Sequence, residues 1–386
     1  MKFSKSITGF FKQTDIIFWF LTLAATAYGL ILIQSMSRAG SGSGRGFFMT
    51  QLIGIALGYA FAVIISLMDY NVLSKYWIWF AVLSIGIIVY TLFFGWGPDG
   101  VDDRAWVTFG TINFQPSELV KIFFILTFSE HLYLIKQKNS EISLLGLISL
   151  LFHASVPIIL VHMQGDDGTA LVFLFMFLFM SFSGGIKLRY YIISLICILT
   201  AVPILWEAFL NDDQKSRFLA VLNLDESVLG KGWQQYQGKL SIASGELTGR
   251  GLFSGPRVAS GIVPYQESDF IFTVAGEELG FIGCMLIISI LFALCLRTLK
   301  IAYSSKDNLG QYICFGFFGM IFSQSIINIA MCLGLIPVIG ITLPFFSSGG
   351  SSIVCLYLGV GLVQSVYYHK QDDNTVKLNL SHSYNY

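Results

Sequence analysis

Apolar runs of roughly twenty residues recur along this chain, and they limit its possible folds more than any other feature of the sequence. A helix of that length spans the ~30 Å hydrocarbon core of a bilayer. In a bilayer the backbone has to satisfy its own hydrogen bonds, so such runs predict helices. Charged residues make up only 12% of the chain, about half the share in soluble domains. The sequence therefore predicts an all-α integral membrane protein.

We predict about ten transmembrane helices from these runs. They cover residues 16–36, 48–68, 76–95, 117–135, 143–162, 169–185, 189–210, 268–296, 309–336 and 345–367. The first run is too long for a signal peptide, so we expect an uncleaved span. The spans form one membrane domain, 16–367, between an N-terminal segment, 1–15, and a C-terminal tail, 368–386. A long connection, 211–267, joins the seventh and eighth helices and is rich enough in aromatic residues to be ordered.

Lysine and arginine lie mostly on one side of this topology. That side holds Lys2, Lys5, Lys12, Lys75, Lys136, Lys138, Lys187, Arg189, Arg297, Lys300, Lys306, Lys370 and Lys377. The short connections of the other side hold only Arg38, Arg45 and Arg104. Cytoplasmic connections carry the basic excess in membrane proteins. We therefore expect both termini in the cytoplasm and the loop 211–267 outside; long loops cross whatever their charge, so this loop is left out of the comparison.

The overall charge and the cysteine pattern exclude several kinds of function. The 23 basic and 23 acidic residues balance, whereas a nucleic-acid-binding protein needs a basic face. Six cysteines lie inside apolar runs without CxxC spacing, which is typical of buried, unreactive thiols. Five histidines are scattered along the chain. The sequence therefore indicates neither a nucleic-acid partner nor a metal cluster.

Ionisable residues at the start of the fourth predicted span indicate a functional site, because charge is costly in a membrane. Gln115, Pro116 and Ser117 lead into Glu118 and Lys121. The acid and the base lie three residues apart on one helix face, so they can pair. Such a pair can hold two helices together or form the polar floor of a site for an anionic substrate. Both interpretations stay open at this point.

Two further acidic motifs lie near the external ends of spans. In the stretch from Gln164 to Thr169, Asp166 or Asp167 can cap the sixth helix; capping explains one acid, and the second suggests cation binding. Asp269 stands at the external boundary of the eighth span, where an N-cap or first-turn position is the plain structural interpretation. Glu277 lies eight residues further, ~12 Å along a helix, so the two do not form a glycosidase-like carboxylate pair.

A run of small residues begins the tenth predicted span. Ser347, Gly349, Gly350 and Ser351 follow Pro344 and Phe346. Small residues allow backbones to approach each other closely. Tight helix packing and contact with a ligand are both compatible with this pattern.

In this order, the motifs resemble the shape, elongation, division and sporulation family, whose members include RodA, FtsW and SpoVE. The resemblance covers nearly the whole chain. It is carried by Arg104 to Trp106, Gln115 to Glu118, Gln164 to Thr169, Ser268 to Phe272, Glu277 to Gly280, Leu343 to Phe345 and Gly349 to Ser351. The stretch from Tyr236 to Gly245 looks closer to RodA than to FtsW.

The resemblance implies a peptidoglycan glycosyltransferase of the bacterial cytoplasmic membrane that polymerises lipid II, a disaccharide-peptide on undecaprenyl pyrophosphate. It implies a class B penicillin-binding protein, a transpeptidase, as partner. Asp269 is the implied catalytic residue, the general base for the attacking sugar hydroxyl. The substrate-binding candidates are Arg104, Trp106, Gln115, Ser117, Glu118, Lys121, Gln164, Asp166, Lys239, Arg250, Glu277, Ser347, Gly349, Gly350 and Ser351.

The pyrophosphate leaving group needs positive charge but no partner acid. Candidate sources of that charge are Arg104, Lys231, Lys239, Arg250 and Arg257, or a divalent cation such as Mg²⁺ or Mn²⁺. Two other functions stay open: a lipid II flippase, and a non-catalytic scaffold for the transpeptidase. A flippase needs polar residues through the bilayer, whereas these motifs gather near the external face, which favours the transferase. Elongation, division and sporulation are all compatible roles.

Overall fold

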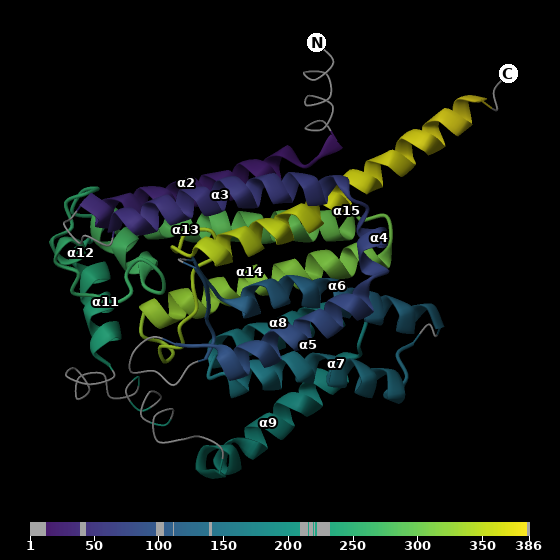
Figure 1. The fold of residues 1–386 in the computed structure, drawn as a ribbon, viewed down its shortest axis with the longest axis horizontal. Helices are drawn as coiled ribbons and strands as arrows, with labels where there is room; N and C mark the ends of the chain where they lie inside the picture. The colour runs from purple at the N-terminus through teal and green to yellow at the C-terminus, as the bar shows by residue number, and fades with distance from the viewer. Residues whose placement is uncertain are drawn as a thin grey trace.

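The structure is a computed structural model, which describes residues 13–38, 44–97, 104–110, 112–138, 141–208, 215, 219, 221 and 232–383. Its long helices lie alongside one another, as Figure 1 shows. The ten longest helices of the described chain are α2 (Ile16–Arg38), α3 (Gly44–Leu67), α5 (Trp77–Phe94), α6 (Pro116–Lys138), α7 (Leu144–Met163), α8 (Asp167–Ser183), α9 (Leu188–Ala208), α13 (Ile271–Tyr303), α14 (Asn308–Cys332) and α15 (Gly350–Ser383). One of them overlaps each predicted range.

Within the described residues, seven helices are long and apolar enough to cross a membrane: α2, α3, α5, α7, α13, α14 and α15. Helices α8 and α9 are also apolar but have shorter apolar stretches. Helix α6 is not among these apolar helices and carries Glu118, Lys121 and Glu130. The protein is thus an integral membrane protein built mostly of helices, and the number of spans beyond these seven stays a prediction.

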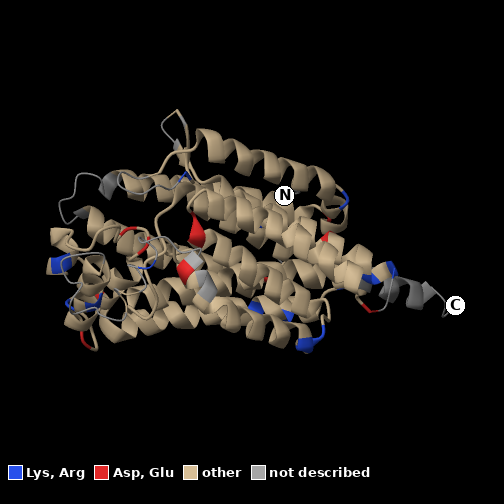
Figure 2. Ribbon diagram, turned by 90° about the horizontal axis from the view of Figure 1, so that it is seen from below, with Lys and Arg blue, Asp and Glu red and all other residues tan. Residues whose placement is uncertain are grey.

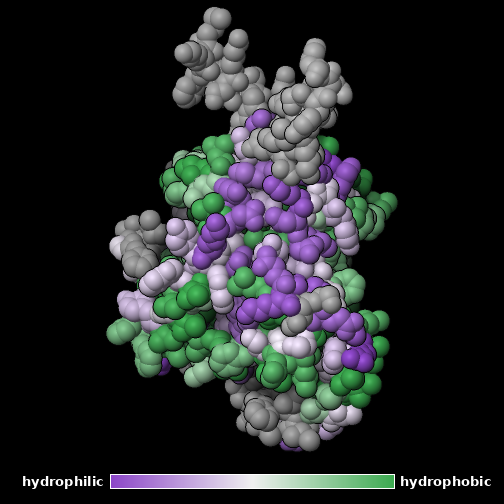
Figure 3. All heavy atoms as spheres, turned by 90° about the vertical axis from the view of Figure 1, so that its right-hand side faces the viewer, coloured by the Kyte–Doolittle hydropathy of each residue, from purple (hydrophilic) through white to green (hydrophobic). Residues whose placement is uncertain are grey.

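Burial follows the logic of a lipid-embedded protein. Side chains of α14 and α15 are largely buried, and α6 buries its polar first turns. Large apolar residues such as Trp79 of α5 and Leu145 of α7 are exposed, as expected where lipid tails surround a bundle. Charged side chains lie mainly toward the two ends of the bundle (Figure 2). Hydrophilic residues gather on one end face, and hydrophobic residues surround them (Figure 3).

Helices α3 and α15 pack closely because glycines face each other's helix. A Cβ atom on Gly54 would lie 2.6 Å from a methyl group of Ile353, and one on Gly361 would lie 2.8 Å from the Ala62 carbonyl oxygen. Small residues at such an interface allow the van der Waals contact on which helix association in membranes depends. This packing holds the start of α15, and the loop before it, against α3.

Helix α13 is broken at Gly280, which the sequence analysis did not predict. Gly280 has φ 64° and ψ −159°, a conformation open mainly to glycine. The break frees backbone groups on both sides, and the loop before α13 binds them: Arg250 N donates to Glu277 O, Gly251 N to Glu278 O, Phe281 N to Glu246 O and Ile282 N to Leu247 O, at 2.9, 3.0, 2.9 and 3.2 Å. Because non-helical backbone in a membrane protein needs such partners, the loop and the helix break stabilise each other.

Short elements complete the fold at the ends of the bundle. Helix α4 (Tyr70–Ser74) joins α3 to α5, and an antiparallel hairpin of β1 (Val107–Phe109) and β2 (Ile112–Phe114) joins α5 to α6. The described part of the predicted external loop contains α11 (Trp233–Ser244) and α12 (Pro256–Ser260). Both lie at the end of the bundle that also holds the α13 break (Figure 1). The predicted order of this loop is therefore confirmed from residue 232 onward, and the rest lies outside the described residues.

Candidate active site

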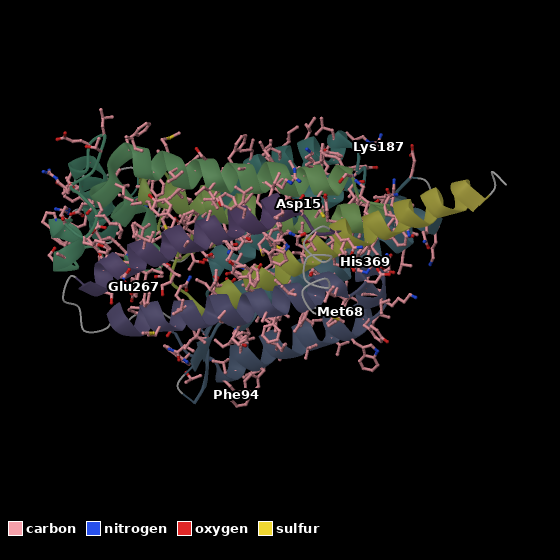
Figure 4. The ribbon with its side chains drawn as sticks, turned by 90° about the horizontal axis from the view of Figure 1, so that it is seen from above. Asp15, Met68, Phe94, Lys187, Glu267 and His369 are labelled. Carbon is pink, nitrogen blue, oxygen red and sulfur yellow. The ribbon has the colours of Figure 1, made fainter. Side chains whose placement is uncertain are left out.

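Asp269 lies on a tight turn that precedes α13. The backbone N–H groups of Ser268, Asp269 and Phe270 all donate to the carbonyl oxygen of Tyr265, at 3.2, 3.1 and 3.2 Å. Helix α13 begins at Ile271, and its N-cap is Phe270, which makes no side-chain capping bond. The interpretation of Asp269 as a helix cap or first-turn residue is therefore wrong, because the turn places its carboxylate ahead of the helix. Figure 4 shows Glu267, two residues before it, at the opposite end of the molecule from Met68 and His369.

The surroundings of Asp269 make it a stronger base than an ordinary aspartate. Its side chain is partly buried. The pKa of this carboxyl group is raised to about 6: burial raises it most, a bond from the Ser268 side chain lowers it, and the nearby carboxylates of Glu267 and Asp166 raise it. A carboxylate with this pKa is ionised at neutral pH and still able to accept a proton, which suits a general base.

Asp166 caps α8, as predicted. Its carboxylate also connects the motif from Gln164 to Thr169 with the motif from Gln115 to Glu118. Its Oδ1 accepts from Thr169 N at 2.9 Å, at the start of α8. Its Oδ2 accepts from Gln115 Nε2 at 2.8 Å and lies 3.5 Å from Ser117 Oγ. Burial raises the pKa of Asp166, which the bonds from Thr169 oppose. The structure therefore brings Asp166, Gln115 and Ser117 together, close enough to Asp269 to act on its charge.

The second acid of the same motif lies elsewhere. Asp167 Oδ1 is 2.5 Å from His162 Nδ1, on an exposed part of the external end. In the part of the chain that the structure describes, no group of three or more histidine, cysteine, aspartate or glutamate side chains is placed to hold a metal ion. A cation at this end would accordingly depend on Asp166, with further oxygen ligands from water or substrate.

Glu118 and Lys121 form the predicted ion pair. Lys121 Nζ lies 2.8 Å from Glu118 Oε1, and both side chains are almost fully buried. Ser352 Oγ of α15 donates to the other carboxylate oxygen of Glu118, at 3.2 Å. The pair is near enough to Asp166 for its two charges to influence that carboxyl group in opposite directions. It therefore holds α6 to α15 directly beneath the polar cluster around Asp166.

The small-residue motif before α15 reaches the same cluster. Ser351 Oγ is 3.5 Å from Gln115 N. Ser347 Oγ donates to the Ser268 carbonyl oxygen at 2.5 Å. A Cβ atom on Gly350 would lie 2.7 Å from the Thr50 side chain, and Gly349 N donates to Gln51 Oε1 at 2.9 Å. Tight helix packing and contact with a ligand were the two open interpretations of this motif. Tight packing is present, and the same residues also border the site.

Several predicted substrate-binding residues lie outside this cluster. The Gln164 side chain is buried and donates to the Ile88 carbonyl oxygen at 2.8 Å. Glu277 is fully buried, and its Oε1 accepts from Arg257 N at 2.7 Å. The exposed basic candidates are Arg104, Lys239 and Arg250, and Trp106 is half-buried. The substrate-binding role of each of these residues stays a prediction.

The last two candidate sources of positive charge are Arg257 and Lys231. The Arg257 side chain bonds to Ser241 Oγ at 3.0 Å and to Gln237, so it is engaged within the external loop. Lys231 lies outside the described residues.

Two buried amides outside the substrate-binding candidates hold the cluster together. Asn328 of α14 donates to the Asp269 carbonyl oxygen at 2.7 Å. Gln51 of α3 donates to the Ser347 carbonyl oxygen at 3.1 Å. Both are fully buried amides inside otherwise apolar helices, and a buried amide without a partner is costly. An amide residue inside an apolar helix was therefore the sequence feature that could have identified both positions.

Comparison with known proteins agrees with this arrangement. Residues 15–372 match the profile of a family described as cell cycle proteins, which is named after FtsW, RodA and SpoVE. The chain belongs to the FtsW, RodA and SpoVE family. The chain is 29% identical to peptidoglycan glycosyltransferase MrdB of Escherichia coli K12 over 355 residues, 91% of this chain and 92% of that protein. It is 32% identical to the probable peptidoglycan glycosyltransferase FtsW of Borreliella burgdorferi, over 89% of this chain and 94% of that protein.

Solved structures of this family have the same fold. A chain from a peptidoglycan synthase complex, described as coordinating polymerisation and crosslinking, matches with a TM-score of 0.79 and 25% identity, over 92% of this chain and 98% of that chain. The crystal structure of the rod shape determining protein RodA of Thermus thermophilus matches with a TM-score of 0.68 and 24% identity, over 92% of this chain and 97% of that chain. A mostly helical membrane fold like that of RodA is thereby confirmed, and the ten spans and the placement of the long loop stay predictions.

Proposed function

We propose that this chain is a peptidoglycan glycosyltransferase, which polymerises lipid II into glycan strands at the external face of the cytoplasmic membrane. The observation that carries the proposal is a carboxylate, Asp269, with a pKa of about 6, set beside the Asp166, Gln115 and Ser117 cluster in a protein of this family. Its curated relatives in Escherichia coli and Borreliella burgdorferi are named as peptidoglycan glycosyltransferases or probable ones.

In the proposed reaction Asp269 accepts the proton of a sugar 4-hydroxyl as that oxygen attacks the anomeric carbon of a second lipid II. The new glycosidic bond forms while the bond from the anomeric carbon to the pyrophosphate breaks. Pyrophosphate leaves as a stable anion, so no acid has to protonate it. Positive charge stabilises it, and the exposed side chains of Arg104, Lys239 and Arg250 are the protein's candidates. The buried Lys121 is already neutralised by Glu118.

A divalent cation, Mg²⁺ or Mn²⁺, fits the donor set as a further source of positive charge. Asp166 supplies hard carboxylate oxygens, which these ions prefer. Mg²⁺ usually binds one or two carboxylates together with substrate phosphates and water, so one protein carboxylate suffices. A bound cation would stabilise the charge that develops on the pyrophosphate.

An apolar cavity beside the cluster suits the lipid tail of the substrate. It has a volume of about 440 Å³ and lies between α5 and the hairpin; its lining residues are Val82, Leu83, Gly86, Ile87, Tyr90, Thr91, Val107, Phe114 and Pro116. Pro116 and Phe114 directly flank Gln115, which bonds to Asp166. A polyprenyl chain in this cavity would therefore place the pyrophosphate near the carboxylates.

A class B penicillin-binding protein is the proposed partner, because it would crosslink the strands that this chain produces. The similar solved structure of a complex that couples polymerisation to crosslinking supports this pairing. Relatives named MrdB and FtsW are both among those compared, so elongation and division are both supported roles, and sporulation stays an alternative.

The test is polymerisation of lipid II by the purified protein, with and without its transpeptidase, followed by gel separation of the glycan products. Strands longer than a disaccharide are the expected result. A preparation that makes no strands under either condition would overturn the proposal. If the same protein moves labelled lipid II across a vesicle bilayer, it is a flippase, and if it does neither but activates the transpeptidase, it is a scaffold.

The proposed orientation predicts which surface residues a membrane-impermeant thiol reagent can reach. We expect Ser260→Cys, on exposed α12, to react in spheroplasts, and Lys138→Cys, at the exposed end of α6, to react only after lysis. Both changes are made in a Cys197→Ser background, because Cys197 is the exposed cysteine of the described chain. The opposite labelling pattern would place Asp269 on the cytoplasmic side and contradict the assignment.

The pKa of Asp269 predicts the pH dependence of polymerisation. A general base has to be deprotonated, so kcat/KM should fall tenfold per pH unit once the pH drops below the base's pKa. Because burial and nearby carboxylates raise that pKa to about 6, the acid limb should have its midpoint near pH 6. A midpoint near pH 4, the ordinary range for aspartate, would show that the base is in a more solvated place. The measurement is the initial rate from pH 4.5 to 8 at low lipid II concentration.

A further inference from the structure

The backbone of the Asp269 turn is held by hydrogen bonds at three successive carbonyl oxygens. Ser348 N donates to Glu267 O at 2.8 Å. Ser347 Oγ donates to Ser268 O at 2.5 Å, and Asn328 Nδ2 donates to Asp269 O at 2.7 Å. We call these three donors the carbonyl clamp. They come from α14 and from the loop before α15, so two elements grip a turn that is distant from both in sequence.

The donors of the clamp are themselves fixed. Asn328 is fully buried, and its Nδ2 also donates to Ile341 O at 2.7 Å. Ser347 Oγ accepts from Leu343 N at 2.8 Å. On the far side of the loop, Gln51 Nε2 donates to Ser347 O and Gln51 Oε1 accepts from Gly349 N, at 3.1 and 2.9 Å. The loop therefore cannot shift without breaking buried hydrogen bonds, which are expensive to leave unmade.

Both sides of the clamp contain a strained residue. Tyr265, whose carbonyl closes the Asp269 turn, has φ +54°, and Phe345, in the loop that supplies Ser347, has φ +69°. Bulky side chains rarely adopt this left-handed conformation. Such strain persists where the surrounding structure overdetermines the backbone, and it concentrates at functional sites. The clamp is the set of contacts that overdetermines these two segments.

We propose that Asn328 and Ser347 are positioning residues for catalysis, which hold the Asp269 carboxylate in its half-buried place beside Asp166. This inference rests on the proposed function of Asp269 as the base. Neither side chain has to touch the reacting atoms: the amide and the hydroxyl act on the main chain, and the main chain sets the direction of the carboxylate. A displacement of about 1 Å in a catalytic group can cost a hundredfold in rate.

The decisive variant is Asn328→Leu, which keeps the branched shape and the number of heavy atoms of the side chain and removes its donor. We expect kcat for lipid II polymerisation to fall between about tenfold and a hundredfold, with KM changed less than about threefold. The acid limb of the pH profile should also move from near pH 6 toward pH 4, because a released turn lets water reach the carboxylate. The groups facing that carboxylate, Glu267, Asp166 and the Ser268 hydroxyl, are unchanged by the substitution.

Gln235→Leu is the matched control. Gln235 of α11 is also a buried amide that donates to two carbonyl oxygens, Met331 O at 3.2 Å and Ile336 O at 2.6 Å. It ties α11 to the other end of the same loop, but no bond from it reaches the Asp269 turn. We expect it to lower thermal stability as Asn328→Leu does, while kcat stays within about threefold and the acid limb stays near pH 6.

The outcomes separate the inference from the proposed function. If Asn328→Leu leaves both kcat and the acid limb unchanged, the positioning role is overturned. It is also overturned if Gln235→Leu loses as much kcat and shifts the acid limb as far as Asn328→Leu does. If Asn328→Leu does not fold, Ser347→Ala is tested instead. A Ser347→Ala variant with normal kcat and an acid limb that stays near pH 6 contradicts the positioning role of the clamp. The proposed function fails separately, when the wild type makes no glycan. A fully active Asp269→Asn removes only the base on which this inference rests.

Discussion

Asp269→Asn is expected to lower lipid II polymerisation by about 10²–10⁴-fold, the usual loss when a general base is removed. The amide keeps the shape of the side chain, but it can neither accept the proton nor carry negative charge. The fold should survive, because Asp269 does not cap α13, whose N-cap is Phe270. The measurement is the initial rate of glycan synthesis by purified variant and wild type, with thermal unfolding recorded on the same samples.

Asp167→Asn is the control for this change. It is the same substitution at an acid of the external end, but Asp167 lies beside the exposed His162 rather than in the Asp166 and Gln115 cluster. We expect it to polymerise within a few-fold of wild type. Activity of Asp269→Asn within a few-fold of wild type would remove Asp269 from the mechanism and direct the search for the base to Asp166 or Glu277.

Lys121→Met is expected to destabilise the protein by about 3–5 kcal/mol, the cost of stranding one member of a buried ion pair. Glu118 would keep the Ser352 hydroxyl but lose Lys121 as its partner, at a position with almost no solvent contact. Replacing both residues with apolar ones of similar size should recover most of the stability. The measurement is thermal unfolding in one detergent for the wild type, the single variant and the double variant.

Lys187→Met provides the comparison, because Lys187 and Glu141 form an ion pair of nearly equal length, 2.7 Å, with both side chains exposed. Water and salt screen such a pair, so its loss should barely change the unfolding temperature. Equal losses for Lys121→Met and Lys187→Met would contradict the argument from burial. If the double apolar variant at 118 and 121 polymerises lipid II at the wild-type rate, the pair is structural only, and its place beneath the Asp166 cluster has no part in substrate binding.

Local features of the chain were predictable from sequence, because each depends on residues within a few positions of one another. The length of an apolar run determines where a helix can lie in a membrane, and a long helix overlaps each predicted range. Glu118 and Lys121 had to meet once that segment was helical, since residues three apart share a helix face. Asp166 was recognisable as a cap for the same reason, because its partner Thr169 is three residues away.

The tertiary structure alone decided how these local pieces meet. Gly280 was expected to continue a helix, but the loop from Glu246 to Gly251 bonds to the free groups of a break there. Asp269 was expected at the boundary of that helix, as its cap or in its first turn, but the Tyr265 turn places it ahead of α13.

The site itself depends on contacts between residues far apart in the chain. Gln115 reaches Asp166 across 51 residues, and Asn328 reaches Asp269 across 59. No periodicity or spacing encodes such contacts, because they depend on which helices pack together. The sequence by itself determined a helical membrane protein with its acids and amides in place, and packing determined which of those acids became the half-buried carboxylate that we propose as the base.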